Sequence, residues 1–200
     1  QSAQAGITGG SVKARKDIVV RAFNKGSATA NIKSGTQKSV LGNVEKKTLP
    51  TASYYNTKAY ASGDTKLVSE LGSISITTED DARAQSIVSG ANVSAGGIIN
   101  LDYTKGENQV DVVNAIELQG TMDAYAHFTA RTISNANMTA RSSKDGKGFY
   151  ATTKISAKNT LTRSATICVL DGTAIKANFG KLDILAEAGP GDTSTTNAKI

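Results

Sequence analysis

Residues 72–84 read GSISITTEDDARA, and residues 10–22 read GSVKARKDIVVRA. Both stretches begin with Gly-Ser, continue with apolar residues at alternate positions, and close in Arg-Ala beyond a charged patch. Alternation of apolar and polar residues is typical of a β-strand that has one face in a core. Because one chain contains the pattern twice, the sequence favours a structure built from stacked, similar layers.

The same alternation recurs along the chain, whereas helical periodicity is hard to find. Many of the positions on the apolar face are Ala, which suits a narrow and regularly layered interior. The alternation predicts that the inward residues are Val12, Ala14, Ala28, Ala30, Ile32, Ile74, Ile76, Ala82, Ala84, Ala124, Ala126, Phe128, Ala130, Met138, Ala140, Leu182, Ile184, Ala186 and Ala188.

The composition limits the chemistry that the 200 residues could perform. There is one His and one Cys, there is no Trp, and the formal net charge is +6. The positive charge favours anionic partners in general, although acidic residues lie between the basic ones. No apolar run approaches the roughly 18 residues that a membrane-spanning helix needs, so no transmembrane segment is expected.

Many short strands with small inward residues fit either a parallel β-helix (β-solenoid) or an antiparallel sandwich. One strand type that recurs, with weaker strands after it, favours an all-β parallel β-solenoid formed by residues 1–200 as a single segment. With about 22 residues in each coil, the chain would form about nine coils and a rod roughly 40 Å long. Residues 46–64 break the pattern and are expected to form an irregular loop, in which Tyr54, Tyr55 and Tyr60 are the candidate contact residues.

The candidate catalytic residues have simpler interpretations. Alternation places His127 on the outer face, between Tyr125 and Thr129, where it is expected to be non-catalytic. Cys168 lies in a strand with two apolar faces and is expected to be a buried, inert thiol. The acids at 79–81 would alternate between faces on a strand, so they are not expected to converge, and a solvated turn is the simpler interpretation.

Other kinds of site find no support in the sequence. The Gly-rich segments match neither nucleotide-binding glycine motif, and the basic pairs lack the interleaved aromatics of nucleic-acid sites. No catalytic residue, cofactor, metal site or nucleic-acid partner is therefore expected.

Residues 72–97 and 172–189 resemble the passenger regions of giant bacterial surface adhesins, the filamentous haemagglutinin-like and leukotoxin-like proteins exported by two-partner or autotransporter pathways. The shared unit is a small-residue turn, then Val or Ile alternating with Ala, then Ala-rich strands. The resemblance covers most of residues 66–189, and more weakly residues 10–33. It implies an extracellular location at the bacterial cell surface and a role in adhesion and virulence.

The expected function is therefore a structural and adhesive section of an exported surface filament, either part of a longer repetitive chain or a fibre subunit. Its partners would be a receptor or glycan on a host or neighbouring cell, and end-to-end self-association would suit a fibre. Two alternatives stay open at this point. One is a polysaccharide-degrading β-helix enzyme, and the other is a compact antiparallel adhesin or pilin-like fibre subunit.

Overall fold

The computed structural model describes residues 1–33, 43–90, 99–144, 150–187 and 193–199, and these form β-strands joined by short turns. The strands are β1 (Ser2–Thr8), β2 (Ser11–Ala14), β3 (Ile18–Lys33), β4 (Asn43–Ser62), β5 (Lys66–Ser69), β6 (Ile74–Gly90), β7 (Ile99–Leu118), β8 (Thr121–Ala124), β9 (Phe128–Lys144), β10 (Tyr150–Val169), β11 (Ala174–Ala177), β12 (Leu182–Ala186) and β13 (Thr193–Lys199).

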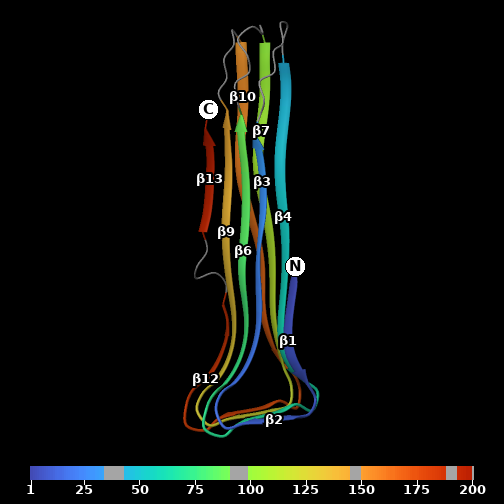
Figure 1. The fold of residues 1–200 in the computed structure, drawn as a ribbon, viewed down its shortest axis with the longest axis vertical. Helices are drawn as coiled ribbons and strands as arrows, with labels where there is room; N and C mark the ends of the chain where they lie inside the picture. Colours follow the sequence, from blue (N-terminus) through green and yellow to red (C-terminus); the bar gives the residue numbers. More distant parts are fainter. Residues whose placement is uncertain (34–42, 91–98, 145–149, 188–192, 200) are drawn as a thin grey trace.

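The strands build three parallel sheets. Sheet A contains β1, β4, β7 and β10, sheet B contains β2, β5, β8 and β11, and sheet C contains β3, β6, β9 and β12, with β13 beside the second half of β9. Each coil passes along a strand of sheet A, crosses a short strand of sheet B at the base, and returns along sheet C (Figure 1). Coil 1 is β1 to β3, coil 2 is β4 to β6, coil 3 is β7 to β9, and coil 4 is β10 to β12.

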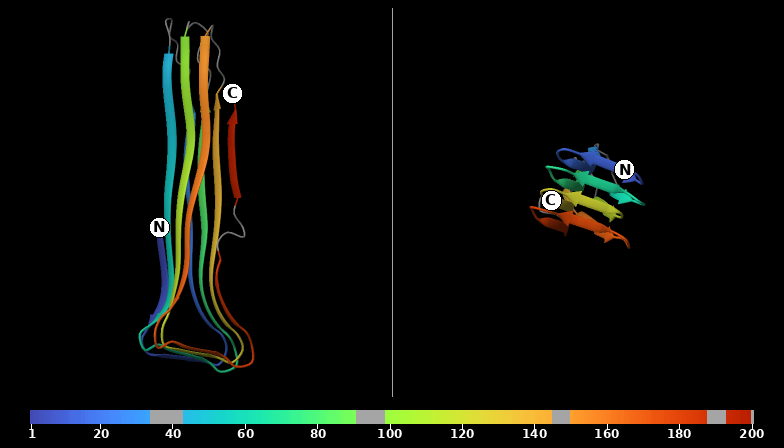
Figure 2. Two further views of the ribbon diagram at one scale, coloured as in Figure 1. Left: turned by 180° about the vertical axis from the view of Figure 1, so that it is seen from behind. Right: turned by 90° about the horizontal axis from the view of Figure 1, so that it is seen from below.

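Parallel pairing confirms the predicted β-solenoid. Every strand pair among the described residues is parallel, so the antiparallel alternative is wrong. The four coils lie one above another when the molecule is viewed from its base (Figure 2).

The predicted coil length is wrong. Stacked partners such as Ile99 and Tyr150, or Asn43 and Asn100, are separated in the sequence by more than twice the expected length of a coil. The described chain therefore makes four large coils rather than nine small ones. The long axis in Figure 1 runs along the strands, which reach about 65 Å, whereas the stacked strands are only about 15 Å deep. The molecule is a flat blade rather than a rod.

The predicted irregular loop at residues 46–64 is also wrong. Residues 43–62 form the 20-residue strand β4, which pairs with β7 along most of its length. Pro50 is tolerated because β1 covers β4 only from Asn56 onward, which leaves Pro50 at a part of the strand without a described neighbour on that side. Along the second half of β4, Lys58 and Tyr60 alternate with the small buried residues Thr57, Ala59 and Ala61, and Tyr55 is itself buried.

The corner between sheets A and B is turned by glycines with positive φ in every coil. At Gly120, φ is 100°, and a Cβ would lie 2.1 Å from the carbonyl oxygen of Thr65 in the coil before it. Only glycine combines this backbone conformation with so close an approach of two coils. The corner therefore fixes where each strand of sheet A ends.

The corner between sheets B and C is held by a ladder of side-chain acceptors. Asp17 Oδ1 accepts the backbone N–H of Ser73 at 2.7 Å, and Ser73 Oγ accepts that of His127 at 3.3 Å. His127 Nδ1 in turn accepts the backbone N–H of Lys181 at 2.9 Å. Each residue immediately precedes a strand of sheet C, so the ladder links all four coils at the same position.

Two apolar clusters fill the space between sheets A and C. The cluster near the base includes the fully buried Ile74, Leu118 and Phe128, and the second cluster, further from the base, includes Tyr55, Val112 and Met138. Between them lies a belt of buried polar residues, which consists of Asn24, Thr57, Thr78, Asp80, Asn114, Thr132 and Ser134.

An amide ladder crosses the interior beyond the second cluster. Asn108 Nδ2 donates to Asn159 Oδ1 of the next coil at 2.9 Å, and Asn159 Nδ2 donates to Ser194 Oγ at 2.9 Å. A buried amide needs hydrogen-bond partners, and Asn159, which is paired with Asn108 in sheet A, supplies one for the Asn108 amide. The ladder thus helps to set the register of coils whose paired residues are far apart in the sequence.

Candidate functional site

The candidate contact surface is a column of large side chains along the corner between sheets B and C. Leu71, Tyr125 and Phe179 each lie three residues before the first residue of a strand of sheet C, and those first residues are in register. Their exposed fractions are 56%, 40% and 77%. Arg15 takes the same position in coil 1, and its carbonyl oxygen accepts the Leu71 N–H at 3.0 Å. We call these four residues the corner column.

The aromatic part of the column is a packed pair. The Tyr125 and Phe179 ring centroids lie 4.7 Å apart, with an angle of 44° between the ring planes. Exposed apolar residues that occur singly need no explanation, but a column that continues through three coils is typical of an interaction site. The two rings meet because Tyr125 and Phe179 lie at the same bend, between sheets B and C, in neighbouring coils.

A hollow of about 410 Å³ lies beside the coil 1 end of the column. It is lined by Arg15, Lys16, Asp17, Leu71 and Gly72. Gly72 is required here because a Cβ would lie 2.4 Å from Asp17 Oδ1. Asp17 Oδ1 is held by the Ser73 N–H, and no ion pair joins Arg15 or Lys16 to another described residue. The two cations are therefore available to an anionic group.

The predicted contact tyrosines differ in their accessibility. Tyr54 is exposed and Tyr60 is partly exposed, but the ring of Tyr60 covers Gly6 and lies 5.4 Å from Lys58 Nζ. Tyr55 is buried in the second apolar cluster, where burial raises the pKa of its phenol, so its prediction as a contact residue is wrong. Neighbouring residues on a strand point to opposite faces, which separates Tyr54 from Tyr55.

The acids at 79–81 lie in the middle of β6 and not in a turn. Glu79 points outward to Arg21, Asp80 points inward, and Asp81 points outward to Lys25 and Arg83. The prediction that they do not converge is confirmed, whereas the predicted solvated turn is wrong. This arrangement does not provide the facing pair of carboxylates that glycoside hydrolysis uses.

Asp80 is a buried carboxyl in the polar belt. The Thr57 hydroxyl donates to its Oδ1 at 2.5 Å, and Oδ2 makes no hydrogen bond of ordinary geometry with a described residue. Burial raises the pKa of Asp80 above its ordinary value, and the Thr57 hydroxyl and the Asn114 side chain offset only part of that effect. By contrast, hydrogen bonds from Arg83 and Lys25 lower the pKa of the partly exposed Asp81.

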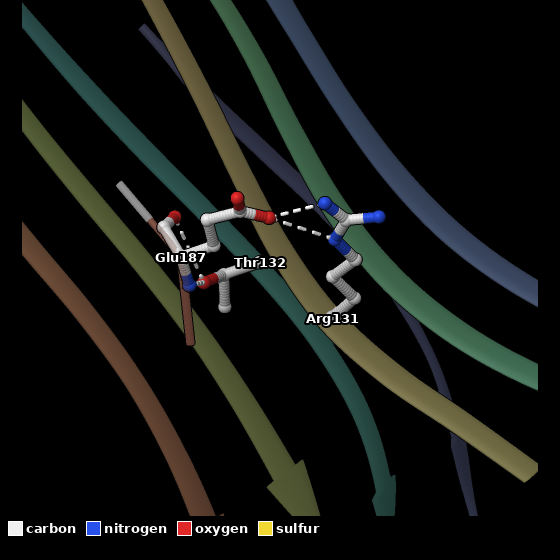
Figure 3. A network of polar contacts seen from close by, with 3 residues as sticks. All are labelled: Arg131, Thr132 and Glu187. Atoms are coloured by element: carbon white, nitrogen blue, oxygen red, sulfur yellow. Dashed lines mark hydrogen bonds and ion pairs between the residues drawn. The ribbon is translucent and has the colours of Figure 1, made fainter. Parts of the chain in front are cut away.

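Ion pairs between coils follow one direction. Three of these pairs are Lys13–Glu70, Lys58–Glu117 and Arg131–Glu187. In each, the cation lies on the earlier coil, and the anion lies on the next coil, two residues beyond the residue that is paired with the cation in the sheet. Figure 3 shows the last of these pairs, beside which the Glu187 N–H donates to Thr132 Oγ1 at 3.1 Å. Each pair contributes little alone, but the shared direction favours one stacking order over its reverse.

The single histidine and the single cysteine both lie on the outer face. The exposed position of His127 agrees with its prediction, although its part in the corner ladder could not be read from the alternation. Cys168 is exposed and not buried, because Ile167 takes the inward position opposite Ile116 in β7. The prediction of a buried thiol is therefore wrong.

The sequence reasoning missed the corner column as a candidate surface. The signal was present, because Leu71, Tyr125 and Phe179 recur at equal intervals along the chain. The recurrence is recognised only when the sequence is divided into coils of their actual length, which is more than twice the expected one.

Comparison of the chain with protein-family models, with curated proteins and with solved structures finds no match. In the described part of the chain, no helix is long and apolar enough to cross a membrane. The same residues contain no group of three or more His, Cys, Asp or Glu side chains that could hold a metal ion.

Proposed function

We propose that this chain is a structural and adhesive section of an exported bacterial surface filament, with a non-catalytic role at the cell surface. The stack of coils supplies the filament, and the corner column supplies a surface for contact with a receptor or glycan on another cell. The resemblance of residues 66–189 to filamentous haemagglutinin-like adhesins supports the same proposal.

The observation that carries the proposal is the uncovered end of coil 4. Leu182 and Ile184 occupy the inward positions that Phe128 and Ala130 occupy in coil 3, yet their exposed fractions are 55% and 40% instead of zero. A solenoid buries its inward apolar residues by stacking coils on one another. At coil 1 the inward Ile18 and Val20 are already buried, with exposed fractions of 6% and 7%, so the uncovered apolar surface lies at coil 4. A further coil would therefore cover this end in a filament.

The two ends of the described stack also fit each other. In a head-to-tail arrangement that continues the register, Leu182 and Ile184 would lie over Ile18 and Val20, and Lys181 would lie beside Asp17. An interface of this kind does not close on itself and generates an open filament. End-to-end self-association is thus part of the proposed function.

Sedimentation velocity over a range of concentrations tests this proposal. We expect concentration-dependent growth of open-ended assemblies, which the double variant Leu182→Asp and Ile184→Asp should abolish. The matched control is Val113→Asp, because Val113 points outward from β7, which has a paired strand on each side and so lies away from both ends of the stack. A chain that stays monomeric, or assembly that the end variant leaves unchanged, would contradict the proposed stacking.

A further inference from the structure

We propose that the corner column binds an acidic polysaccharide. The sugar rings would stack on Leu71, Tyr125 and Phe179, and an acidic group of the chain would pair with Arg15 and Lys16. The inference rests on the proposed function, since it names the chemistry of the partner that the adhesive surface recognises.

The apolar part of the column offers a platform for sugar rings. An aromatic face carries partial negative charge, which attracts the C–H groups on one side of a sugar ring. Phe179 is the most exposed large apolar side chain of the described residues, and Tyr125 packs against it. Small-molecule sites are lined mainly by apolar and aromatic side chains with a few polar groups, and the column beside Arg15 and Lys16 has this composition.

The cations lie at one end of the platform. Arg15 and Lys16 line the hollow beside Leu71, and a guanidinium can bind a carboxylate or sulfate through two parallel hydrogen bonds. The hollow has room for such a group because Gly72 presents no side chain there. Charge complementarity therefore selects an acidic saccharide over a neutral one.

The shape of the column selects a polymer. Its four positions recur at the spacing of stacked strands, so they extend for about 15 Å along the stacking direction. A platform of this length accommodates several consecutive rings, whereas a single sugar would use only part of it.

The charge distribution distinguishes a polysaccharide from other anionic polymers and surfaces. Nucleic acid carries one phosphate per nucleotide and needs cations along its whole path, but the free cations of the column lie at one end. An anionic membrane would need a strongly positive base, yet residues 9–17, 63–73, 119–127 and 170–181 contain six Lys or Arg and five acids. The sparse charge of a polysaccharide fits the column better than either.

Binding of the full chain to immobilised hyaluronate, polygalacturonate and heparin tests the inference, with neutral dextran, oligo(dT) and phosphatidylserine vesicles as comparison probes. We expect saturable binding to at least one acidic polysaccharide. The double variant Tyr125→Ser and Phe179→Ser should weaken it about tenfold, as loss of an aromatic anchor does. The matched control is Tyr54→Ser, an exposed tyrosine in sheet A, which should leave binding unchanged.

The charged part of the site has its own variants. Arg15→Gln with Lys16→Gln should weaken binding and reduce its dependence on salt, whereas Lys66→Gln with Lys176→Gln at the same base should do neither. If Tyr125→Ser affects folding, the single variant Phe179→Ser tests the aromatic part of the site, because the Phe179 side chain is mostly in solvent.

Three outcomes would overturn the inference: no binding to any of the three acidic polysaccharides, equal loss in the control variants, or preferential binding to oligo(dT) or vesicles. A chain that assembles in sedimentation but fails these binding tests would lose this inference and keep the proposed stacking.

Discussion

Replacement of the buried carboxyl of Asp80 by an amide, Asp80→Asn, should stabilise the protein at neutral pH. Asp80 is fully buried, Thr57 donates to its Oδ1, and its Oδ2 makes no hydrogen bond of ordinary geometry with a described residue. An asparagine keeps the oxygen that accepts from Thr57 and carries no charge. Its amide N–H can donate to a buried oxygen such as Ser134 Oγ, which makes no hydrogen bond with the described residues.

The sign of the pH dependence follows from the raised pKa of Asp80. Above the ordinary pKa of an aspartate, the unfolded chain releases this proton while the folded chain retains it. The free energy of unfolding therefore falls as pH rises from the unfolded-state pKa to the folded-state pKa. Below both values the carboxyl is protonated in both states, and this contribution to the pH dependence vanishes.

The size of the effect follows from the cost of one buried polar group without a partner. That cost is about 1–3 kcal/mol, and the Thr57 hydrogen bond offsets part of it. We therefore expect Asp80→Asn to gain about 1–2 kcal/mol at pH 7, or a few degrees in Tm for a chain of this length, and much less at pH 3. Urea unfolding followed by circular dichroism at several pH values measures the difference.

The neighbouring Asp81 provides the matched control. Its pKa is lowered by Arg83 and Lys25, so its contribution to stability is present above the ordinary pKa and is lost as pH falls through the lowered value. Asp81→Asn should therefore cost a few tenths of a kcal/mol at pH 7, a typical value for an ion pair near the surface. A destabilising Asp80→Asn, or a stabilisation equal at pH 3 and pH 7, would refute the assignment of Asp80 as a buried, uncompensated carboxyl.

Three further substitutions test the stack. His127→Ala should lower the free energy of unfolding by about 1 kcal/mol, because it removes the acceptor for the Lys181 N–H, whereas His127→Asn should remain close to the native value in urea unfolding. Phe128→Ala should cost about 3–5 kcal/mol in the same assay, because its side chain is fully buried in the cluster near the base. Gly120→Ala should lower Tm more than Gly172→Ala. Both glycines have positive φ, but of the two only Gly120 has backbone atoms of another coil where a Cβ would lie. Equal losses of Tm would contradict the close approach of the two coils at that corner.

The strands and their faces could be predicted from the local pattern of residues. Of the predicted inward residues, Ile74, Ile76, Ala82, Ala84, Phe128, Ala130, Met138 and Ala140 are buried. Val12, Leu182 and Ile184 take positions in register with buried residues of the neighbouring coil, but they are exposed. Each lies in an end coil, which has a stacked neighbour on one side only, although Ile18 and Val20 of the same end coil as Val12 are buried. The predicted inward Ala188 lies outside the described residues. The prediction succeeds because the two-residue period of a strand is set by local backbone geometry, and a narrow core selects small apolar residues at every second position.

The stacking of the strands could not be predicted in the same way. Two similar stretches at Gly10 and Gly72 suggested short, equivalent coils, but the first continues into β2 at the base and the second begins β6 of sheet C. The burial of Asp80, the exposure of Cys168 and the alignment of the corner column all depend on partners in neighbouring coils, which are distant in the sequence. Alternation shows which residues share a face of one strand. It carries no information about which strand lies beside it, because that choice is made by glycine corners, buried polar ladders and the packing of whole coils.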